Sequence, residues 1–242
     1  MVPMINGSTD SSTGSGADTP LLSARDITHN FGAETILGGV SFDIAAGETV
    51  AIMGPSGSGK TTLLNCLSGI LAPTGGEVVF DGEVISSWPD ARRSALRLRK
   101  FGFVFQDGQL LPELSARDNV ALTARLGGVP TQRARAKAEE MLDRLGIGHL
   151  AMRRPGAMSG GQAQRVAIAR ALVAQPRVVF ADEPTGALDQ AAGHEAIQLL
   201  TSVAQTLGAT LVLVTHDSSV ASWCDRLVEL RDGIVHYDGR MR

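Results

Sequence analysis

One run of residues has the types and spacing needed to bind a phosphate. Residues 54–61 read Gly-Pro-Ser-Gly-Ser-Gly-Lys-Thr and fit the pattern G-x-x-x-x-G-K-[ST]. In such a loop, glycines let backbone N–H groups turn toward a phosphate, the lysine reaches the outer phosphates, and the threonine hydroxyl ligates Mg²⁺. A flexible Gly/Ser turn is the alternative, but at about 7% glycine usage the four fixed positions match by chance only about 1% of the time in such a chain. The candidate binding residues are Gly54, Pro55, Ser56, Gly57, Ser58, Gly59, Lys60, Thr61 and Thr62.

Two neighbouring carboxylates end a second apolar run. Residues 176–183 suit a buried strand that finishes in Asp182 and Glu183. One carboxylate can hold Mg²⁺ through water, and the next can orient or deprotonate an attacking water, as an ATP-hydrolysing site requires. This pair is therefore the candidate catalytic centre.

Two more polar residues follow predicted strands. Gln106 comes directly after the predicted strand 101–105. His216 comes just after the predicted strand 210–214, which is expected to neighbour the strand that ends at Asp182. Open α/β sheets place ligand-facing groups at the carboxyl ends of their strands. A lone histidine is more often a turn or core residue, so each signal gains weight only from the others.

A second glycine-rich segment opens a helix. Ser159, Gly160, Gly161 and Gln162 are typical of a capping box, with Ser159 as the N-cap. The glycines, which lower helix stability relative to alanine, also suit a helix start that a phosphate approaches. Both interpretations remain open on the sequence alone.

Phe31 is a candidate for stacking on a nucleotide base, because it ends a strand-like run and is followed by a glycine. The plain alternative is that it fills a sheet, as other phenylalanines do. Asp189 lies in a turn that follows the two carboxylates and precedes a helical segment.

The surrounding pattern predicts an α/β protein with a P-loop NTPase core. Strand-like runs cover residues 21–31, 39–44 and 49–53, a hairpin is expected over 76–84, and another closes the chain over 226–239. Residues 115–154 show helical spacing instead, which predicts a helical insert.

The predicted division of the chain follows from these patterns. Residues 1–20 are expected to be a disordered tail and residues 21–242 a single domain, because the tail is rich in Gly, Ser, Thr and Asp. Within the domain, residues 21–106 and 176–242 would form the nucleotide-binding core with an antiparallel β-subdomain. Residues 107–175 would form the helical subdomain.

Composition narrows the class of partner. The chain has 242 residues, is 43% hydrophobic and carries a formal net charge of −3, which suits a soluble protein and disfavours nucleic acid as a partner. No stretch approaches the roughly 18 apolar residues of a membrane span, so the chain is expected to remain in the cytosol.

Cys66 and Cys224 have no metal spacing and are expected to be small apolar residues that fill the core. The basic run 91–100 is expected to be a solvated helix face, with acidic lipid headgroups as the alternative contact.

Taken in order, these segments resemble the nucleotide-binding subunit of an ATP-binding cassette (ABC) transporter, over about residues 21–238. The stretches 102–106, 119–122 and 181–189 look most like the lipoprotein-releasing, macrolide-exporting and haem-exporting branch of bacterial systems. Met158 stands where the family usually has leucine in its signature, a change between apolar side chains of similar volume.

The resemblance implies a head-to-tail dimer that sandwiches two ATP molecules. Ser159 to Gln162, the signature, would touch a γ-phosphate held by Lys60 of a second copy, and Asp189 would couple the two sites. The resemblance also assigns the remaining roles: Phe31 to adenine, Thr61 and Gln106 to Mg²⁺, Asp182 to Mg²⁺ through water, Glu183 to the attacking water, and His216 to the γ-phosphate.

The same resemblance implies a partner and a place. A separate transmembrane permease would dock near Gln106 and the helical subdomain, which puts the protein on the cytoplasmic face of the cell membrane, powering an exporter or extractor. The alternative is a non-transport ABC ATPase acting on DNA or the ribosome, although such proteins usually carry long coiled coils or two ATPase halves. A plain P-loop regulator or kinase would leave the Ser159 signature without a reason. The cargo is not encoded in this chain.

Overall fold

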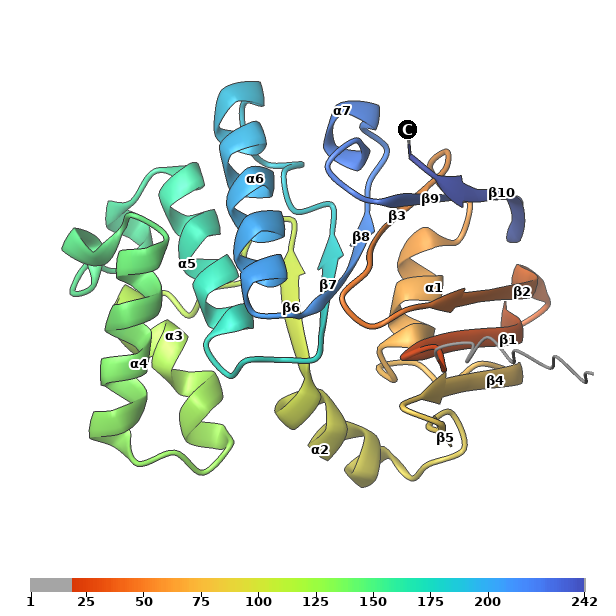
Figure 1. The fold of residues 1–242 in the computed structure, drawn as a ribbon, viewed down its shortest axis with the longest axis horizontal. Helices are drawn as coiled ribbons and strands as arrows, with labels where there is room; N and C mark the ends of the chain where they lie inside the picture. The colour runs from red at the N-terminus through yellow and green to blue at the C-terminus, as the bar shows by residue number, and fades with distance from the viewer. Residues whose placement is uncertain (1–18, 242) are drawn as a thin grey trace, which may run out of the picture.

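A computed structural model describes residues 19–241. Except for its last two residues, the predicted disordered tail, residues 1–20, lies outside the described part of the chain. The predicted fold class is confirmed: an α/β core carries an antiparallel sheet at one end and a group of helices at the other (Figure 1).

The core is a six-stranded sheet in the order β10-β9-β3-β8-β7-β6. Its strands are β3 (Thr49–Met53), β6 (Phe101–Phe105), β7 (Val178–Asp182), β8 (Thr210–Val214), β9 (Arg226–Arg231) and β10 (Ile234–Arg240). Only β10 is antiparallel to its neighbour. Strands buried on both faces are continuous apolar runs, which is why most of these strands were recognisable. The parallel strands all end at one edge of the sheet, so the residues that follow them gather there.

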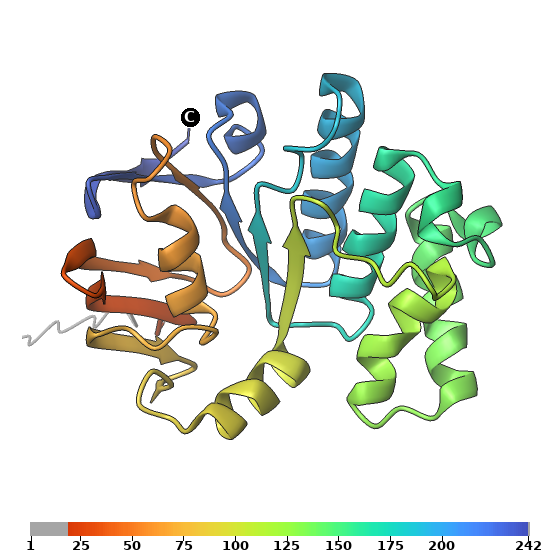
Figure 2. The same ribbon diagram turned by 180° about the vertical axis from the view of Figure 1, so that it is seen from behind.

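Successive residues of these strands face two different cores. Val50 and Ile52 of β3 pack with α1 (Lys60–Leu67) and the second sheet, whereas Ala51 faces the core that contains α5 (Gly160–Leu172) and α6 (Gln190–Thr206). In Figure 1 α6 lies beside β6 and nearer to the viewer, and in Figure 2, the view from behind, β6 is the nearer of the two. The six-stranded sheet is therefore covered on both faces.

The second sheet has four antiparallel strands in the order β2-β1-β4-β5. They are β1 (Leu22–Phe31), β2 (Glu34–Ile44), β4 (Gly75–Phe80) and β5 (Glu83–Val84). The N–H of Gly38 donates to the carbonyl of Gly233 at 2.9 Å, which joins β2 to the turn between β9 and β10. Gly233 has a positive φ of 74°, and a Cβ there would lie 2.3 Å from the carbonyl oxygen of Ile36. Only glycine fits this junction between the two sheets.

A cluster of helices occupies the far end of the molecule. The helices α3 (Ala116–Leu126) and α4 (Thr131–Arg144) pack on α5, with the short turns η1 (Gly148–Leu150) and η2 (Pro155–Ala157) between α4 and α5. Their contact faces bury small side chains, which lets the helix backbones approach closely; these include Ala121, Ala124, Ala134 and Ala138. Figure 1 shows the cluster beside β6, on the side away from the four-stranded sheet.

Helix α2 (Asp90–Lys100) carries the basic run. The guanidinium of Arg92 lies 3.5 Å from the ring centroid of Trp88 and 2.8 Å from the carboxylate of Glu83. Arg97 donates to the carbonyl of Gly69. These intramolecular contacts favour the structural interpretation of the run over contact with lipid headgroups. The four-residue helix α7 (Ser218–Ala221) was not predicted, because it is too short to show helical periodicity.

Candidate functional site

The phosphate loop connects β3 to α1. Gly57 and Gly59 have φ values of +80° and +95°, and a Cβ at Gly59 would lie 2.9 Å from the carbonyl oxygen of Ile36. Helix α1 begins at Lys60, so its first N–H groups have no acceptor one turn earlier and their dipoles favour an anion. The loop therefore has the backbone geometry of a phosphate cradle.

Lys60 is 8% exposed and folds back over this loop. Its Nζ donates to the carbonyl oxygens of Gly54 at 2.9 Å and Pro55 at 2.8 Å. An ammonium group has three donors, so one remains for a phosphate oxygen. Within the described residues the buried hydroxyl of Ser58 has no hydrogen-bond partner. An incoming phosphate would give both groups an acceptor.

Thr61 and Asp182 meet at the carboxyl edge of the sheet. The hydroxyl of Thr61 donates to Oδ1 of Asp182 at 3.2 Å. Burial raises the pKa of the Asp182 carboxyl and the charge of Glu183 raises it further, whereas the hydrogen bond from Thr61 and the charge of Lys60 oppose the rise. A divalent cation would offset this burial. Mg²⁺ prefers hard oxygen ligands, so the donors present here fit it.

Glu183 follows Asp182 in a left-handed backbone conformation, with φ +45°. Its N–H donates to the carbonyl of Val214 in β8 at 3.0 Å, and its side chain meets His216, which follows that strand. A left-handed non-glycine residue raises the energy of the fold by about 1–3 kcal/mol, and such conformations cluster at functional sites. In this conformation the Glu183 side chain lines the same cavity as the phosphate loop.

A cavity of about 360 Å³ brings together the loop, one carboxylate and the four-stranded sheet; it is lined by Phe31, Ile36, Ser56, Gly57, Gly59, Lys60, Thr61, Thr62 and Glu183. Phe31 is 56% exposed and touches the buried ring of His29 edge-on, with 4.7 Å between ring centroids. Such exposure does not suit a residue that fills a sheet. An exposed aromatic ring and the phosphate loop thus line the same cavity.

Gln106 lies at the same sheet edge, one residue beyond β6. Phe105 pairs with Asp182 in the register of β6 and β7. The Gln106 side chain packs on Gly186, where a Cβ would lie 2.8 Å from Nε2 of Gln106. A side chain larger than that of glycine at position 186 would displace the Gln106 amide from this contact.

The signature occupies a different cavity. Ser159 and Gln162 form the capping box in both directions, so the structural interpretation is correct: the Gln162 N–H donates to the Ser159 hydroxyl at 3.3 Å, and the Ser159 N–H donates to Oε1 of Gln162 at 3.0 Å. Asp189 caps α6 by accepting from the N–H of Ala192 at 2.9 Å. Ser159 to Gln162 and Asp189 line one cavity of about 400 Å³.

The signature cavity and the phosphate cavity share no lining residue. One chain therefore does not bring Ser159 to Lys60. The predicted site residues fall into two groups: the phosphate loop with Phe31, Glu183 and its neighbours, and the signature with Asp189.

Three polar residues near Gln106 were missed by the sequence analysis. Asn119 and Gln164 are buried, and Arg170 lies within the otherwise apolar stretch 166–172. Their only signal was a polar side chain on an apolar helix face. All three bond to the backbone near Gln106 or to the loop after it.

A groove of about 430 Å³ lies between α2, β6, α3 and α5. Apolar side chains line much of it, including Leu98, Phe103, Phe105 and Leu126. Two guanidinium groups, Arg97 and Arg170, line it as well, and no carboxylate does. Leu126 is 63% exposed at its rim.

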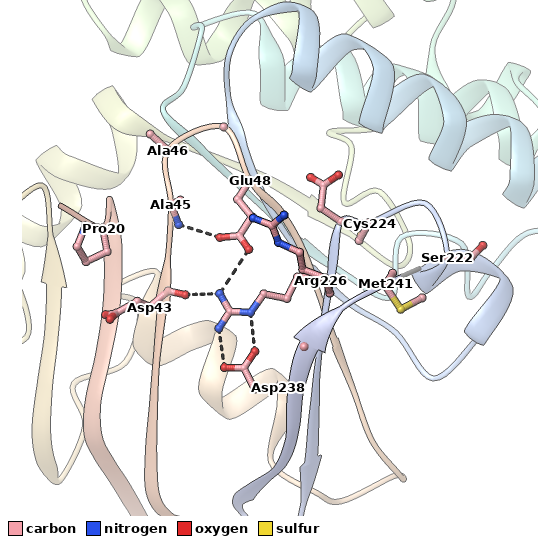
Figure 3. A pocket seen from close by; sticks show the side chains of 14 residues that line it. Pro20, Asp43, Ala45, Ala46, Glu48, Ser222, Cys224, Arg226, Asp238 and Met241 are labelled. Atoms are coloured by element: carbon pink, nitrogen blue, oxygen red, sulfur yellow. Dashed lines mark hydrogen bonds and ion pairs between the residues drawn. The ribbon is translucent and has the colours of Figure 1, made fainter. Parts of the chain in front are cut away.

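A larger cavity, of about 1010 Å³, lies where β3 and β9 begin, at the opposite edge of the sheet (Figure 3). Arg226 donates there to both carboxylate oxygens of Asp238, to Glu48 and to the backbone carbonyl of Asp43. The hydrogen bonds with Asp238 raise the pKa of Arg226. This guanidinium is engaged within the chain, and none of the predicted site residues lines the cavity.

No helix in residues 19–241 combines the length and the apolar character needed to cross a membrane.

Comparison with known families and proteins gives consistent matches. The family described as ABC transporter matches residues 37–186. The lipoprotein-releasing system ATP-binding protein LolD of Bacteroides fragilis is 43% identical over 215 residues, which are 89% of this chain and 100% of LolD. The macrolide export ATP-binding/permease protein MacB of Brucella melitensis is 44% identical over 230 residues, which are 93% of this chain and 35% of MacB. The chain thus spans about a third of the length of its MacB relatives.

A solved structure matches at the level of the fold. The dimeric post-hydrolysis state of the ATP-binding cassette MJ0796 bound to ADP and Pi has a TM-score of 0.83 and 39% sequence identity. The match covers 91% of this chain and 99% of the MJ0796 chain.

Proposed function

This chain belongs to the ABC transporter family as an ATP-binding, ATP-hydrolysing domain, and we propose that it drives transport by pairing head-to-tail with a second copy and acting on a separate membrane-spanning permease. Its relatives are named as ATP-binding components of lipoprotein-release and macrolide-export systems. Those names support an exporter or extractor as the direction of transport.

The observation that carries the dimer is the separation of the two cavities. Ser159 and Asp189 line one cavity while Lys60 and Glu183 line another, which supports a site completed by the signature of a second chain. The MJ0796 cassette with which the chain aligns was solved as a dimer. In the proposed dimer each ATP lies between the phosphate loop of one chain and the Ser159–Gln162 corner of the other.

The proposed roles of the residues combine the family resemblance with the arrangement of the phosphate cavity. Lys60 and the N–H groups at the start of α1 would hold the β- and γ-phosphates, and Phe31 would stack on the adenine. Thr61, Gln106 and, through water, Asp182 would hold Mg²⁺, which neutralises phosphate charge when bound. Glu183 would orient the attacking water and take its proton, and His216, bonded to Glu183, would sense the γ-phosphate.

The groove between α2, β6, α3 and α5 is the proposed permease contact. Its apolar walls suit the apolar face of a helix, and Phe105 and Gln109, which flank Gln106 closely, both line it. Docking there would place the protein on the cytoplasmic face of the membrane. ATP-driven closure and opening of the dimer would then move the permease helix seated in the groove.

The test of the proposed function is a purification from detergent-solubilised membranes of the source organism. A protein with membrane spans should co-purify with this chain. Adding that partner in lipid should change the Mg²⁺-dependent ATPase rate of the chain. Co-purification with DNA or ribosomes instead, with no membrane-spanning partner, would favour the non-transport alternative and overturn the proposal.

A further inference from the structure

The loop that carries Gln106 is held by side chains from helices. Residues 106–115 follow β6 and contain no regular helix or strand. The guanidinium of Arg170 donates to the carbonyl oxygens of Gly108 and Gln109, both at 2.7 Å. The side-chain amide of Gln164 donates to the carbonyl of Phe105 at 3.3 Å. Both side chains come from α5, which is the signature helix.

The two carbonyls bound by Arg170 belong to consecutive left-handed residues. Gly108 has a φ of +67° and Gln109 a φ of +43°. A non-glycine residue adopts this conformation at an energetic disadvantage unless neighbouring contacts hold it. The planar guanidinium binds both carbonyls at once, which a point charge on a flexible stem would not do. The geometry of the turn therefore depends on Arg170.

The loop also packs directly on α5 and is fixed at its far end by α3. A Cβ at Gly108 would lie 3.3 Å from Oε1 of Gln164 and 3.4 Å from Cβ of Ala167. Asn119, fully buried, accepts from the N–H of Leu111 at 2.8 Å and donates to its carbonyl at 3.0 Å. Within residues 19–241 Arg170 forms no ion pair with a carboxylate, so its charge serves these carbonyls.

We infer that Arg170 is a positioning residue for Gln106, holding the Gln106 loop in register with the helix that begins at the Ser159 signature. Eleven residues along an α-helix span about 16 Å, so the single helix α5 connects Ser159 to the hydrogen bonds that Arg170 makes with the Gln106 loop. Arg170 and Gln109 also line the groove between α2, β6, α3 and α5, so a segment bound in that groove would contact these two residues. The inference rests on the proposed function in one respect, namely that Gln106 contributes to Mg²⁺ binding.

The test compares Arg170→Gln and the milder Arg170→Lys with wild type in the full-length chain. In the nucleotide-free protein, hydrogen–deuterium exchange is expected to rise in residues 106–115 and to stay unchanged in β7 and β8. The Mg²⁺ concentration giving half-maximal ATP hydrolysis should rise about tenfold, as expected for the loss of one or two hydrogen bonds. Arg144→Gln, which removes a surface ion pair with Glu140, is the control that should leave both quantities unchanged.

A double-variant cycle separates positioning from general stability. If Arg170 acts through Gln106, the combination of Arg170→Lys with Gln106→Ala should raise the Mg²⁺ requirement no further than Gln106→Ala alone. Additive effects, or an unchanged exchange pattern in residues 106–115, would overturn the inference. If Gln106→Ala leaves the Mg²⁺ requirement unchanged, the proposed role of Gln106 fails instead, and the exchange experiment still decides whether Arg170 holds the loop.

Discussion

Nδ1 of His216 lies 2.9 Å from Oε1 of Glu183, although the histidine side chain is 72% exposed and that of the glutamate only 20%. The two residues follow adjacent parallel strands, β8 and β7, so the contact is set by the sheet. Glu183 also lines the phosphate cavity, whereas His216 does not.

Replacing Glu183 by glutamine is expected to preserve ATP binding and to lower turnover about 10²- to 10⁴-fold, because the amide no longer accepts the proton of the attacking water. The variant should accumulate as an ATP-bound dimer, visible by size-exclusion chromatography. Glu77→Gln, on the exposed part of β4, is the control. Near-normal turnover in the Glu183 variant would remove this residue from its assigned role.

Lys60→Ala is expected to weaken ATP binding at least about 30-fold, because it removes a charge-assisted hydrogen bond to the phosphates. The measurement is a titration with a fluorescent ATP analogue. Lys100→Ala removes an exposed lysine from α2 and should leave the affinity unchanged. Equal affinities for wild type and Lys60→Ala would contradict the phosphate-cradle interpretation.

Ser159→Asp is expected to abolish ATP-driven dimerisation while leaving nucleotide binding to the single chain intact. Aspartate and asparagine both serve as N-caps, so neither should unfold α5, but only aspartate repels a γ-phosphate. Ser159→Asn is therefore the matched control. Dimerisation measured in the Glu183→Gln background should be lost with aspartate and retained with asparagine; equal behaviour of the two would argue against a phosphate at this position.

Asp182→Asn is expected to stabilise the nucleotide-free protein at pH 7. The folded-state pKa of Asp182 is raised, so the stability supplied by its neutral form is present below the ordinary pKa of about 3.9 and is lost as pH rises through the folded value. Thermal unfolding should show a higher Tm for the variant at pH 7 and a shrinking difference toward pH 4. Turnover with Mg²⁺ should fall about 10²-fold. Asp143→Asn, at an exposed position of α4, should change neither quantity.

Leu126→Arg is expected to detach the protein from its permease, because it places a third cation beside Arg97 and Arg170 in an otherwise apolar groove. Met152→Arg introduces the same charge at an equally exposed residue, 68% against 63%, that does not line the groove. The measurement is co-purification from solubilised membranes. Retention of the permease by the Leu126 variant would exclude this groove as the contact.

Local signals explain what the sequence analysis predicted correctly. The phosphate loop, the apolar strands and the Ser159 capping box are each encoded within about ten residues, where glycine spacing, apolar runs and capping preferences act directly. Phe31 had two interpretations on the sequence; its exposure argues against the one in which it fills a sheet, and stacking on a base stays a prediction.

Contacts between distant segments were beyond the sequence. No pattern in the sequence indicates that Gln106 packs against Gly186, 80 positions later. The hydrogen bonds of Arg170 could not be predicted either, because its acceptors are backbone carbonyls 61 and 62 residues away and a backbone carbonyl has no sequence signature. The separation of the signature cavity from the phosphate cavity likewise depends on how the helix cluster sits against the sheet.

Two glycines pack closely against the backbone of Ile36. A Cβ at Gly233 would come within 2.3 Å of its carbonyl oxygen, and a Cβ at Gly59 within 2.9 Å of the same atom. One glycine belongs to the β9–β10 turn and the other to the phosphate loop, so the four-stranded sheet that contains Ile36 has little freedom to slide relative to either. The width of the phosphate cavity is thus set before any ligand arrives. A nucleotide would therefore bind to a phosphate cavity that is already in its final shape. Any movement on closure of the proposed dimer would have to come from the helix cluster.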